Sequence, residues 1–481
     1  MVNATAAASG RILQFWDVER DLDLECDVLI VGSGAGGATV AAECAAAGLD
    51  VVVLEEGGFH DSREFTADAI EGVKKLYRGA GSEMVFGKPR VIFAQGRCVG
   101  GSTVINGGMS WRTPERVLET WRRDFGLAGL GAGDLEPVFK TIEERIHVNV
   151  QAPETIGRDG QLLKLGADRL GWKITANTRN QRHCMGSNNC AFGCPTGGKQ
   201  SMLVSYLPRA LAAGARIYAD CRVEKVLVEA GRARSVRARL VDPATRRPGP
   251  ALRARARRAV VLACGATETP LLLLRSGLAN GSGAVGRHLT LHPNAKCVAV
   301  FDEEVTPWKG VHQAYQVHHF LEEGIDIATG FVPPQVLAIS LHAVGDELHD
   351  LLSQMNRIVV GAALIEDTGE GRVRRGLGGL PYITYDWTER DLANLVRGAA
   401  LFAELMFTAG AKLVIPPFPD VPPLRSIDEA RALVGKKPDP RRMEVFTVHL
   451  MGTCRMAADP RRGVVGPGGE AHDVKGLYVA D

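Results

Sequence analysis

A glycine-rich turn followed by a carboxylate is the part of this sequence whose residue types and spacing most clearly predict chemistry. The segment Asp27–Gly37 reads DVLIVGSGAGG, an apolar run that leads directly into the pattern Gly-x-Gly-x-x-Gly. Bare backbone amides at such glycines can approach a pyrophosphate, whose charge is stabilised by the positive end of the following helix. The apolar run Val51–Leu54 then ends in Glu55, a carboxylate placed to bind a ribose and to repel a 2′-phosphate. The residues predicted to form this dinucleotide site are Gly32, Ser33, Gly34, Ala35, Gly36, Gly37 and Glu55.

Two further glycine-containing segments have a similar character. The segment Gln95–Met109 reads QGRCVGGSTVINGGM, and its glycines would let the backbone approach a flat ring system while Ser102, Thr103 and Asn106 orient that ring. The segment Val260–Leu272 reads VVLACGATETPLL, a strand that runs into a helix through Gly265. Each segment alone could be a set of ordinary turns. Their order after the first motif indicates a flavin dinucleotide.

Three cysteines are spaced closely enough to act together. Cys184, Cys190 and Cys194 form the pattern C-x5-C-x3-C, with a proline after the last. Crowded thiolates of this kind are typical ligands of an iron–sulfur cluster. The alternative is a set of buried or metal-free thiols that pack as small apolar groups. The sequence leaves both interpretations open.

Length and composition exclude several classes of protein. The chain has 481 residues, enough for a large buried core and about three domain-sized units. A net charge of +2 gives no reason to expect a nucleic-acid partner. No apolar run approaches the roughly 18 residues of a membrane span, and the N-terminus has no secretory signal pattern. We therefore expect a cytoplasmic protein whose ten cysteines are mostly reduced.

Local patterns also predict the elements that position these motifs. A small-residue helix should follow the first glycine turn and end at Gly48, and arginines that alternate with apolar residues over 252–258 suggest a hairpin with one solvated face. Short strands are expected at Ala295–Phe301 and Pro381–Tyr385. Thr388, with Asp391 three residues later, is a good N-cap for a helix that carries an apolar stripe and ends at Gly410.

Together with the segment HLMGTCRM, residues 449–456, the three glycine-rich motifs resemble the glucose-methanol-choline (GMC) oxidoreductase family. The resemblance extends over nearly the whole chain, and the cysteine-rich segment is similar to that of flavin sugar and alcohol dehydrogenases, some of which carry a [3Fe-4S] cluster. It implies an α/β fold (α+β overall), with a Rossmann-like FAD-binding domain and a second substrate-binding domain built on an antiparallel sheet. The implied FAD contacts beyond the first motif are Arg97, Val99, Gly100, Ser102, Asn106, Gly107, Met109, Val223 and Gly265. Some members attach their flavin through a histidine where this chain has Ile105, so the resemblance implies non-covalent FAD.

The resemblance also predicts how the chain is divided. The segments are 20–139 and 181–290 for the FAD-binding domain, 140–180 as a substrate-side segment, 291–444 for the substrate-binding domain, and 445–481 as a catalytic return to the first domain. The family's second active-site residue follows the position at which this chain ends, Asp481. The expectation is therefore that the sequence is truncated within its last motif.

His449 is the predicted catalytic base, because it occupies the position of the family's catalytic histidine and an imidazole has a pKa suited to accepting a hydroxyl proton. The predicted reaction is FAD-dependent oxidation of a CH–OH group in a small alcohol or sugar, with oxygen, a quinone or a redox protein as electron acceptor. The alternatives are a hydroxynitrile lyase on the same fold and a catalytically impaired flavin-binding fragment. His312, His318 and His319 could line the pocket, but ordinary structural histidines are the favoured interpretation.

Overall fold

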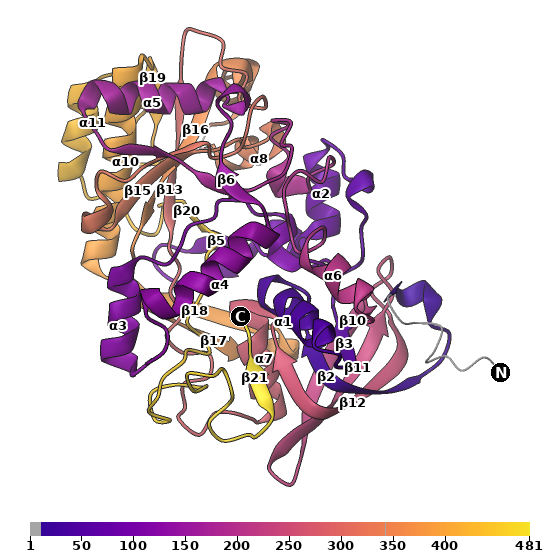
Figure 1. The fold of residues 1–481 in the computed structure, drawn as a ribbon. Helices are drawn as coiled ribbons and strands as arrows, with labels where there is room; N and C mark the ends of the chain where they lie inside the picture. Colours follow the sequence, from indigo (N-terminus) through magenta and orange to yellow (C-terminus); the bar gives the residue numbers. More distant parts are fainter. Residues whose placement is uncertain (1–10, 342) are drawn as a thin grey trace.

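The computed structural model describes residues 11–341 and 343–481, which form two sheets with helices packed on and between them (Figure 1). The first sheet lies at the lower right of Figure 1 and the second at the upper left, with the C-terminus near the helices between them. The strands of the first sheet, in spatial order, are β1 (Ile12–Leu13), β9 (Arg216–Tyr218), β3 (Val51–Leu54), β2 (Leu22–Val31), β12 (Pro248–Leu262), β11 (Arg232–Val241) and β10 (Cys221–Glu229), with β21 (Leu477–Val479) also paired to β12.

The centre of the first sheet is parallel and buried on both faces. Strands β2, β3, β9, β12 and β21 run parallel, and all four residues of β3 are buried. Helix α1 (Ala35–Ala46) packs against α6 (Tyr206–Ala212), while α7 (Gly265–Ser276) packs against β10. Alanines on α1 are buried, since only small side chains allow the helix to lie close on the sheet. A continuous apolar strand such as β3 is the expected sequence signature of this environment.

The antiparallel part of the first sheet confirms the predicted hairpin with one solvated face. In β12, Arg253 and Arg255 are exposed, whereas Leu252, Ala254 and Ala256 are buried. Strands β10, β11 and β12 pair in antiparallel fashion. The arginines therefore belong to an ordinary solvated strand face.

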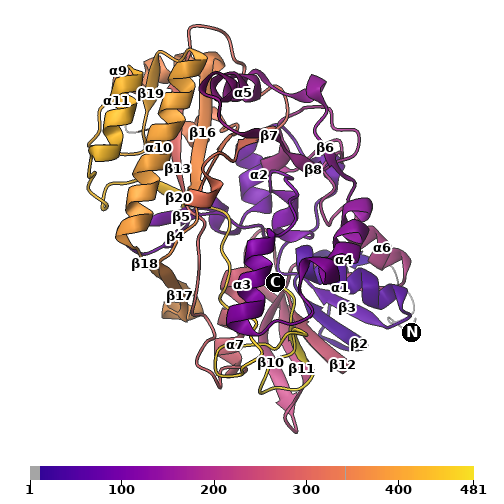
Figure 2. The ribbon, with the colours of Figure 1, turned by 60° about the vertical axis from the view of Figure 1, so that its left-hand side comes forward.

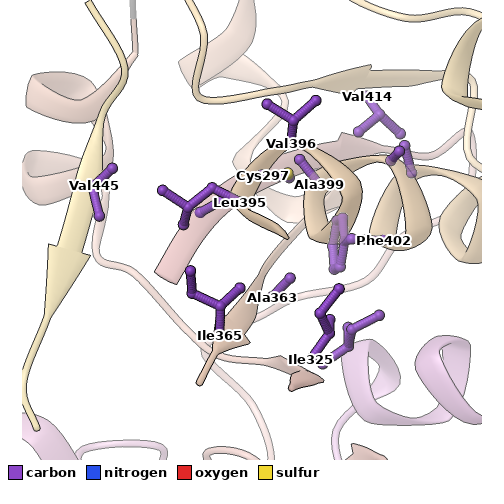
Figure 3. Close-up of a cluster of buried hydrophobic side chains, with 14 of the residues drawn as sticks. Cys297, Ile325, Ala363, Ile365, Leu395, Val396, Ala399, Phe402, Val414 and Val445 are labelled. Atoms are coloured by element: carbon purple, nitrogen blue, oxygen red, sulfur yellow. The ribbon is translucent and has the colours of Figure 1, made fainter. Parts of the chain in front are cut away.

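The second sheet is mostly antiparallel and is covered by a long helix. Its strands, in spatial order, are β4 (Glu83–Val85), β5 (Val91–Phe93), β20 (Val445–Thr447), β13 (Asn294–Val300), β16 (Ile358–Ile365), β15 (Ile325–Thr329), β14 (Tyr315–Val317) and β7 (Ile174–Ala176), with β19 (Leu413–Ile415) also paired to β13. Helix α10 (Glu389–Ala409) packs on β16 and β13 and against α5 (Arg158–Leu170). Figure 3 shows side chains of α10 such as Phe402 and Leu395 packed against strand residues such as Ile325, Ala363 and Cys297. This mixed α/β architecture, with a second antiparallel sheet, confirms the predicted fold class.

Helix α10 begins and ends as the sequence predicts. The Thr388 side chain accepts a hydrogen bond from the Asp391 amide, and the Asp391 carboxylate accepts one from the Thr388 amide, which is a capping box. Gly410 ends the helix in the left-handed region, at φ +112°. Among the described residues α10 is the helix that is long and apolar enough to cross a bilayer, but 56% of its apolar window is buried inside the protein. The apolar stripe of α10 therefore forms part of the hydrophobic core.

The chain passes between the two sheets several times. Strands β4 and β5 come from the segment 20–139, β7 from 140–180 and β20 from 445–481, yet all four join the second sheet. Helix α4 (Ala132–Arg145) lies beside α1, and α3 (Glu115–Phe125) lies near the centre of Figure 2. The remaining elements include α2 (Ala69–Leu76), α8 (Pro334–Ser340), α9 (Gly345–Ser353), α11 (Ile427–Ala432), the pair β6 (Val148–Val150) and β8 (Thr178–Asn180), and the hairpin β17 (Glu370–Arg375) and β18 (Pro381–Asp386).

Candidate functional site

The carboxyl ends of the parallel strands place several predicted site residues along one edge of the first sheet. Val31 of β2 is aligned with Leu54 of β3 and with Leu262 of β12. The residues that directly follow these strands, beginning with Gly32 and Glu55, therefore converge. In open α/β sheets this edge is where nucleotide ligands bind.

Ser33 links the first glycine turn to the second. Its hydroxyl donates to the Glu55 carboxylate over 2.7 Å and accepts from the Gly100 amide over 3.0 Å, and the side chain is fully buried. The Ser33 amide and the Gly57 amide also donate to Glu55, each over 2.8 Å. Burial raises the pKa of Glu55, while these hydrogen bonds act in the opposite direction. The two glycine-rich segments are thus held together by a buried polar network.

A cavity of about 970 Å³ opens along this edge. Its wall takes in the start of α1, the second glycine segment, β10, the start of α7 and the residues around position 450. The predicted site residues that line it are Gly32, Gly34, Ala35, Gly36, Glu55, Ser102, Val223 and Gly265. The predicted residues that do not line it are Ser33, Gly37, Arg97, Val99, Gly100, Asn106, Gly107, Met109 and His449.

The residues that form this cavity fit FAD. A Cβ atom placed on Gly34 would meet nothing within 4 Å, so the bare backbone faces open space, whereas one on Gly36 would lie 1.6 Å from the Ala480 carbonyl oxygen. Gly34 caps α1 without a side-chain hydrogen bond, and the first amides of a helix have no partner within it. These amides form an anion site in the wall of a cavity whose volume, about 970 Å³, is large enough for a large ligand such as a dinucleotide.

Several predicted residues act behind the cavity wall. Gly37 packs on Gly32, because a Cβ there would lie 2.0 Å from the Gly32 carbonyl oxygen. The Met109 sulfur accepts a hydrogen bond from Asn177 over 3.0 Å. Ile105, at the position of the family's flavin-linking histidine, is buried and cannot form such a bond.

Lys199 is a site-supporting residue that the sequence analysis missed. Its ammonium group donates to the carbonyl oxygens of Val104 and Asn106, both over 2.8 Å, and to that of Cys190 over 2.6 Å. Burial lowers the pKa of Lys199 to about 8. One buried cation therefore fastens the second glycine segment to the cysteine-rich segment. No local pattern around position 199 indicates this role.

His449 is paired with His292, which the sequence analysis also missed. The two Nδ1 atoms are 3.0 Å apart and the rings are stacked, with centroids 5.0 Å apart. Asn294 of β13 pairs with Phe446 of β20, so a residue just before one strand meets a residue just after the other. Burial, and secondly His292, lower the pKa of His449 to about 4, so the imidazole is neutral at physiological pH. The residues on either side of His449, Val448 and Leu450, line the cavity.

The backbone around this histidine pair is fixed by two side chains. Asp367 accepts hydrogen bonds from the amides of Leu291 and His292, each over 2.9 Å, and from the Tyr385 hydroxyl over 2.6 Å. The Thr447 hydroxyl accepts from the His449 amide over 3.1 Å and donates to the Leu291 carbonyl oxygen. His292 has a φ of +46°, a conformation that a histidine adopts only when its surroundings hold it there.

The three other histidines of interest have structural roles. His312 is buried and its Nδ1 accepts from the Phe331 amide over 3.3 Å. His318 lies 3.3 Å from Asp326, and the His319 Nδ1 accepts from the Lys173 amide. None of the three lines the cavity.

The predicted iron–sulfur cluster finds no support. Within residues 11–341 and 343–481, no group of three or more cysteine, histidine or acidic side chains is placed to hold a metal. Arg179 donates to the Cys190 sulfur over 3.5 Å, and the Lys199 amide donates to the Cys194 sulfur over 3.4 Å. These thiols therefore act as hydrogen-bond partners. The spacing of the cysteines in the sequence does not by itself place them around a common metal site.

Comparisons with known proteins agree with this site. The family model described as GMC oxidoreductase matches residues 73–294 in its N-terminal part and 369–481 in its C-terminal part, and an FAD binding domain model matches residues 27–70. An uncharacterized GMC-type oxidoreductase of Mycobacterium tuberculosis is 39% identical over 95% of this chain and 71% of its own length. The long-chain-alcohol oxidase FAO1 of Arabidopsis thaliana is 28% identical over 97% of this chain and 64% of its own length.

The fold is similar to that of solved oxidases. Pyridoxine 4-oxidase from Mesorbium loti superposes with a TM-score of 0.69 and 21% sequence identity, over 95% of this chain and 94% of its own. At this identity the likeness concerns the fold. With the family matches and the glycine-lined cavity, it leads to one conclusion: the chain belongs to the GMC oxidoreductase family and has that family's FAD-binding domain.

Proposed function

We propose that this chain oxidises the CH–OH group of an alcohol to a carbonyl, with FAD as hydride acceptor and His449 as the base. The observation that carries the proposal is the pair His292–His449, held beside the cavity that the glycine-rich segments line. When bound, FAD would supply the two-electron acceptor for a hydride from the alcohol carbon.

The residues of this chain would supply the proton transfer and the positioning. A neutral imidazole accepts the hydroxyl proton, and the depressed pKa of His449 keeps the base unprotonated over a wide pH range. The Nδ1 atom of His449 is hydrogen-bonded to His292, whereas the Nε2 atom of His449 makes no hydrogen bond to the described residues. Nε2 is therefore the atom that would accept the proton.

The cavity wall favours an apolar alcohol over a sugar. Val448, Leu450 and Met451, which adjoin His449 in the chain, line the cavity with their apolar side chains, and Trp121, Phe125 and Leu127 add further apolar surface to its wall. A hydrophobic wall gains from removing alkyl surface from water, whereas sugar hydroxyls would lose hydrogen bonds there. The similarity to a long-chain-alcohol oxidase supports the same substrate class, and the oxidase relatives support oxygen as acceptor.

Anaerobic reduction of the bound flavin tests the proposal. FAD-loaded protein is mixed without oxygen with a primary aliphatic alcohol, a benzylic alcohol or glucose, and loss of the visible flavin absorbance is followed. We expect reduction with the apolar alcohols, and His449→Ala should slow it about a hundredfold or more while FAD stays bound. His349, whose exposed side chain lies outside the cavity, receives the same substitution as the control. Flavin that stays oxidised with every alcohol refutes the proposed reaction, and an unchanged rate in His449→Ala removes His449 from it.

A further inference from the structure

The hairpin β17–β18 and the neighbouring strands β4 and β5 carry an exposed apolar surface. Figure 2 shows β5, β4, β18 and β17 following one another down the left-hand side of the molecule. The side chains that form this surface, here termed the apolar ridge, are Met84 (36% exposed), Phe86 (44%), Ile92 (48%), Leu377 (95%), Leu380 (63%) and Tyr382 (43%). Apolar side chains that gather on one face in this way mark an interaction site.

The members of the apolar ridge are contiguous. Met84 and Ile92 are direct cross-strand partners, so their side chains share one face. Phe86, two residues after Met84, stacks on Tyr382 with ring centroids 5.4 Å apart. Leu380 lies two residues before Tyr382 and Leu377 is at the turn of the hairpin. The ridge thus runs from β5 to the hairpin tip.

Four basic side chains flank this ridge without a counter-ion. Lys88, Arg90, Arg374 and Arg375 are exposed, and none of them forms an ion pair with another described residue. Arg374 is the cross-strand partner of Tyr382, and Arg90 directly precedes β5, two residues before Ile92. The acidic residues of the hairpin, Glu370 and Asp386, are cross-strand neighbours at its opposite end. The tip half of the hairpin is therefore apolar and positively charged.

We propose that the apolar ridge docks the protein peripherally on an anionic lipid surface. The ridge projects at a hairpin tip whose leucine is almost fully exposed, a shape that enters the acyl boundary of a bilayer. The basic side chains beside the ridge have no acidic partner among the described residues and are attracted to the negative charge of anionic headgroups. Arg275 fixes the tip by donating to the Gly379 carbonyl oxygen, so the ridge is held in place.

The hairpin β17–β18 connects the ridge to the cavity. Thr368, Gly369 and Glu370, at the base of the hairpin, line the cavity. Arg275, which donates to Gly379 near the tip, lines it as well. Docking through the ridge would bring the cavity wall near the membrane interface, where apolar alcohols accumulate. The docking proposal itself does not depend on the reaction, because it rests only on exposure and charge.

Vesicle co-sedimentation of the full chain tests the docking surface. We expect binding to vesicles of phosphatidylcholine mixed with phosphatidylglycerol, weaker binding to phosphatidylcholine alone, and loss of the difference at high salt. Each basic side chain near an anionic surface raises the membrane partition coefficient by about fivefold. Arg374→Glu combined with Arg375→Glu should therefore reduce this coefficient by at least about 25-fold. Leu377→Ser combined with Leu380→Ser should also reduce binding. Val434→Ser, at an exposed valine outside the ridge, is the control and should bind as the unaltered protein does.

Two results would overturn the proposal. The first is equal sedimentation with both vesicle types, or ridge variants that bind as well as the Val434 control. The second is a dimer in size-exclusion chromatography that the Leu377→Ser and Leu380→Ser changes dissociate, which would assign the ridge to a second copy of this chain. All substituted side chains are exposed, so the variants should unfold at the temperature of the unaltered protein.

Discussion

Replacing Ser33 by alanine should destabilise the protein far more than an ordinary serine substitution. The Ser33 hydroxyl is fully buried and serves two partners, the Glu55 carboxylate at 2.7 Å and the Gly100 amide at 3.0 Å. Loss of a hydrogen bond to a charged group costs about 1.5–3 kcal/mol, and a buried amide left without an acceptor costs about 1–3 kcal/mol. The two losses overlap where water or a backbone shift compensates. We therefore expect Ser33→Ala to lower the free energy of unfolding by about 3 kcal/mol.

The same substitution should weaken FAD binding, because Ser33 joins the two glycine segments that line the cavity. Urea unfolding of the FAD-free protein measures the change in stability, and a flavin fluorescence titration measures the change in affinity. Thr39→Ala is the matched control, since Thr39 lies on the helix that follows Ser33 and its hydroxyl donates to the Ala35 carbonyl oxygen near the surface. It should change stability by no more than about 0.5 kcal/mol.

The reasoning would be refuted if Ser33→Ala changed stability by less than about 0.5 kcal/mol, or by the same amount as the control. It would also be refuted if stability fell as expected while FAD affinity stayed unchanged. In that case the network would be structural without organising the cavity.

Three further substitutions test other parts of the site. His292→Phe keeps His449 buried but removes the second cause of its low pKa, so the acidic limb of the flavin-reduction pH profile should move to higher pH; a limb that stays in place contradicts the pairing. Lys199→Met leaves three carbonyl oxygens without their donor and should lower both stability, by about 3 kcal/mol, and the flavin retained after gel filtration; full retention would show that the lysine does not support the site. Burial lowers the pKa of His312 to about 3, so between about pH 6.5 and 3 the unfolded chain binds a proton that the folded protein excludes, and stability falls on acidification. When the pH is lowered from 7 to 5, the free energy of unfolding of His312→Gln should therefore increase by about 2 kcal/mol relative to that of the unaltered protein, as measured by urea unfolding. His349→Gln, at an exposed site, is the control.

Local patterns in the sequence were sufficient for the parts of the fold in which neighbouring residues cooperate. The turn after Val31 and the small-residue helix that follows it depend on glycines and alanines a few positions apart. The capping box of Thr388 and Asp391 and the terminal Gly410 likewise define α10 within its own segment. In each case the interacting residues are only a few positions apart in the chain. Composition and spacing are therefore enough to predict the local structure.

The sequence patterns pointed to residues on and around the cavity, but did not show which of them form its wall. Gly34, Glu55 and Gly265, which the sequence predicts as FAD contacts, line the cavity. Ser33 and Gly100 lie behind it as a buried link, because their polar groups find each other across 67 residues of sequence. A motif shows that residues act together, whereas only their packing shows which of them face the ligand.

The tertiary structure alone decided the long-range pairings. Strands β5 and β20 lie side by side although more than 350 residues separate Val91 from Val445, and this arrangement carries His449 to His292. The contacts of Lys199 and the separate hydrogen bonds of Cys190 and Cys194 arise in the same way. The physical reason is that a strand's apolar pattern specifies which face is buried but not which strand lies beside it. That choice depends on the packing of the whole core.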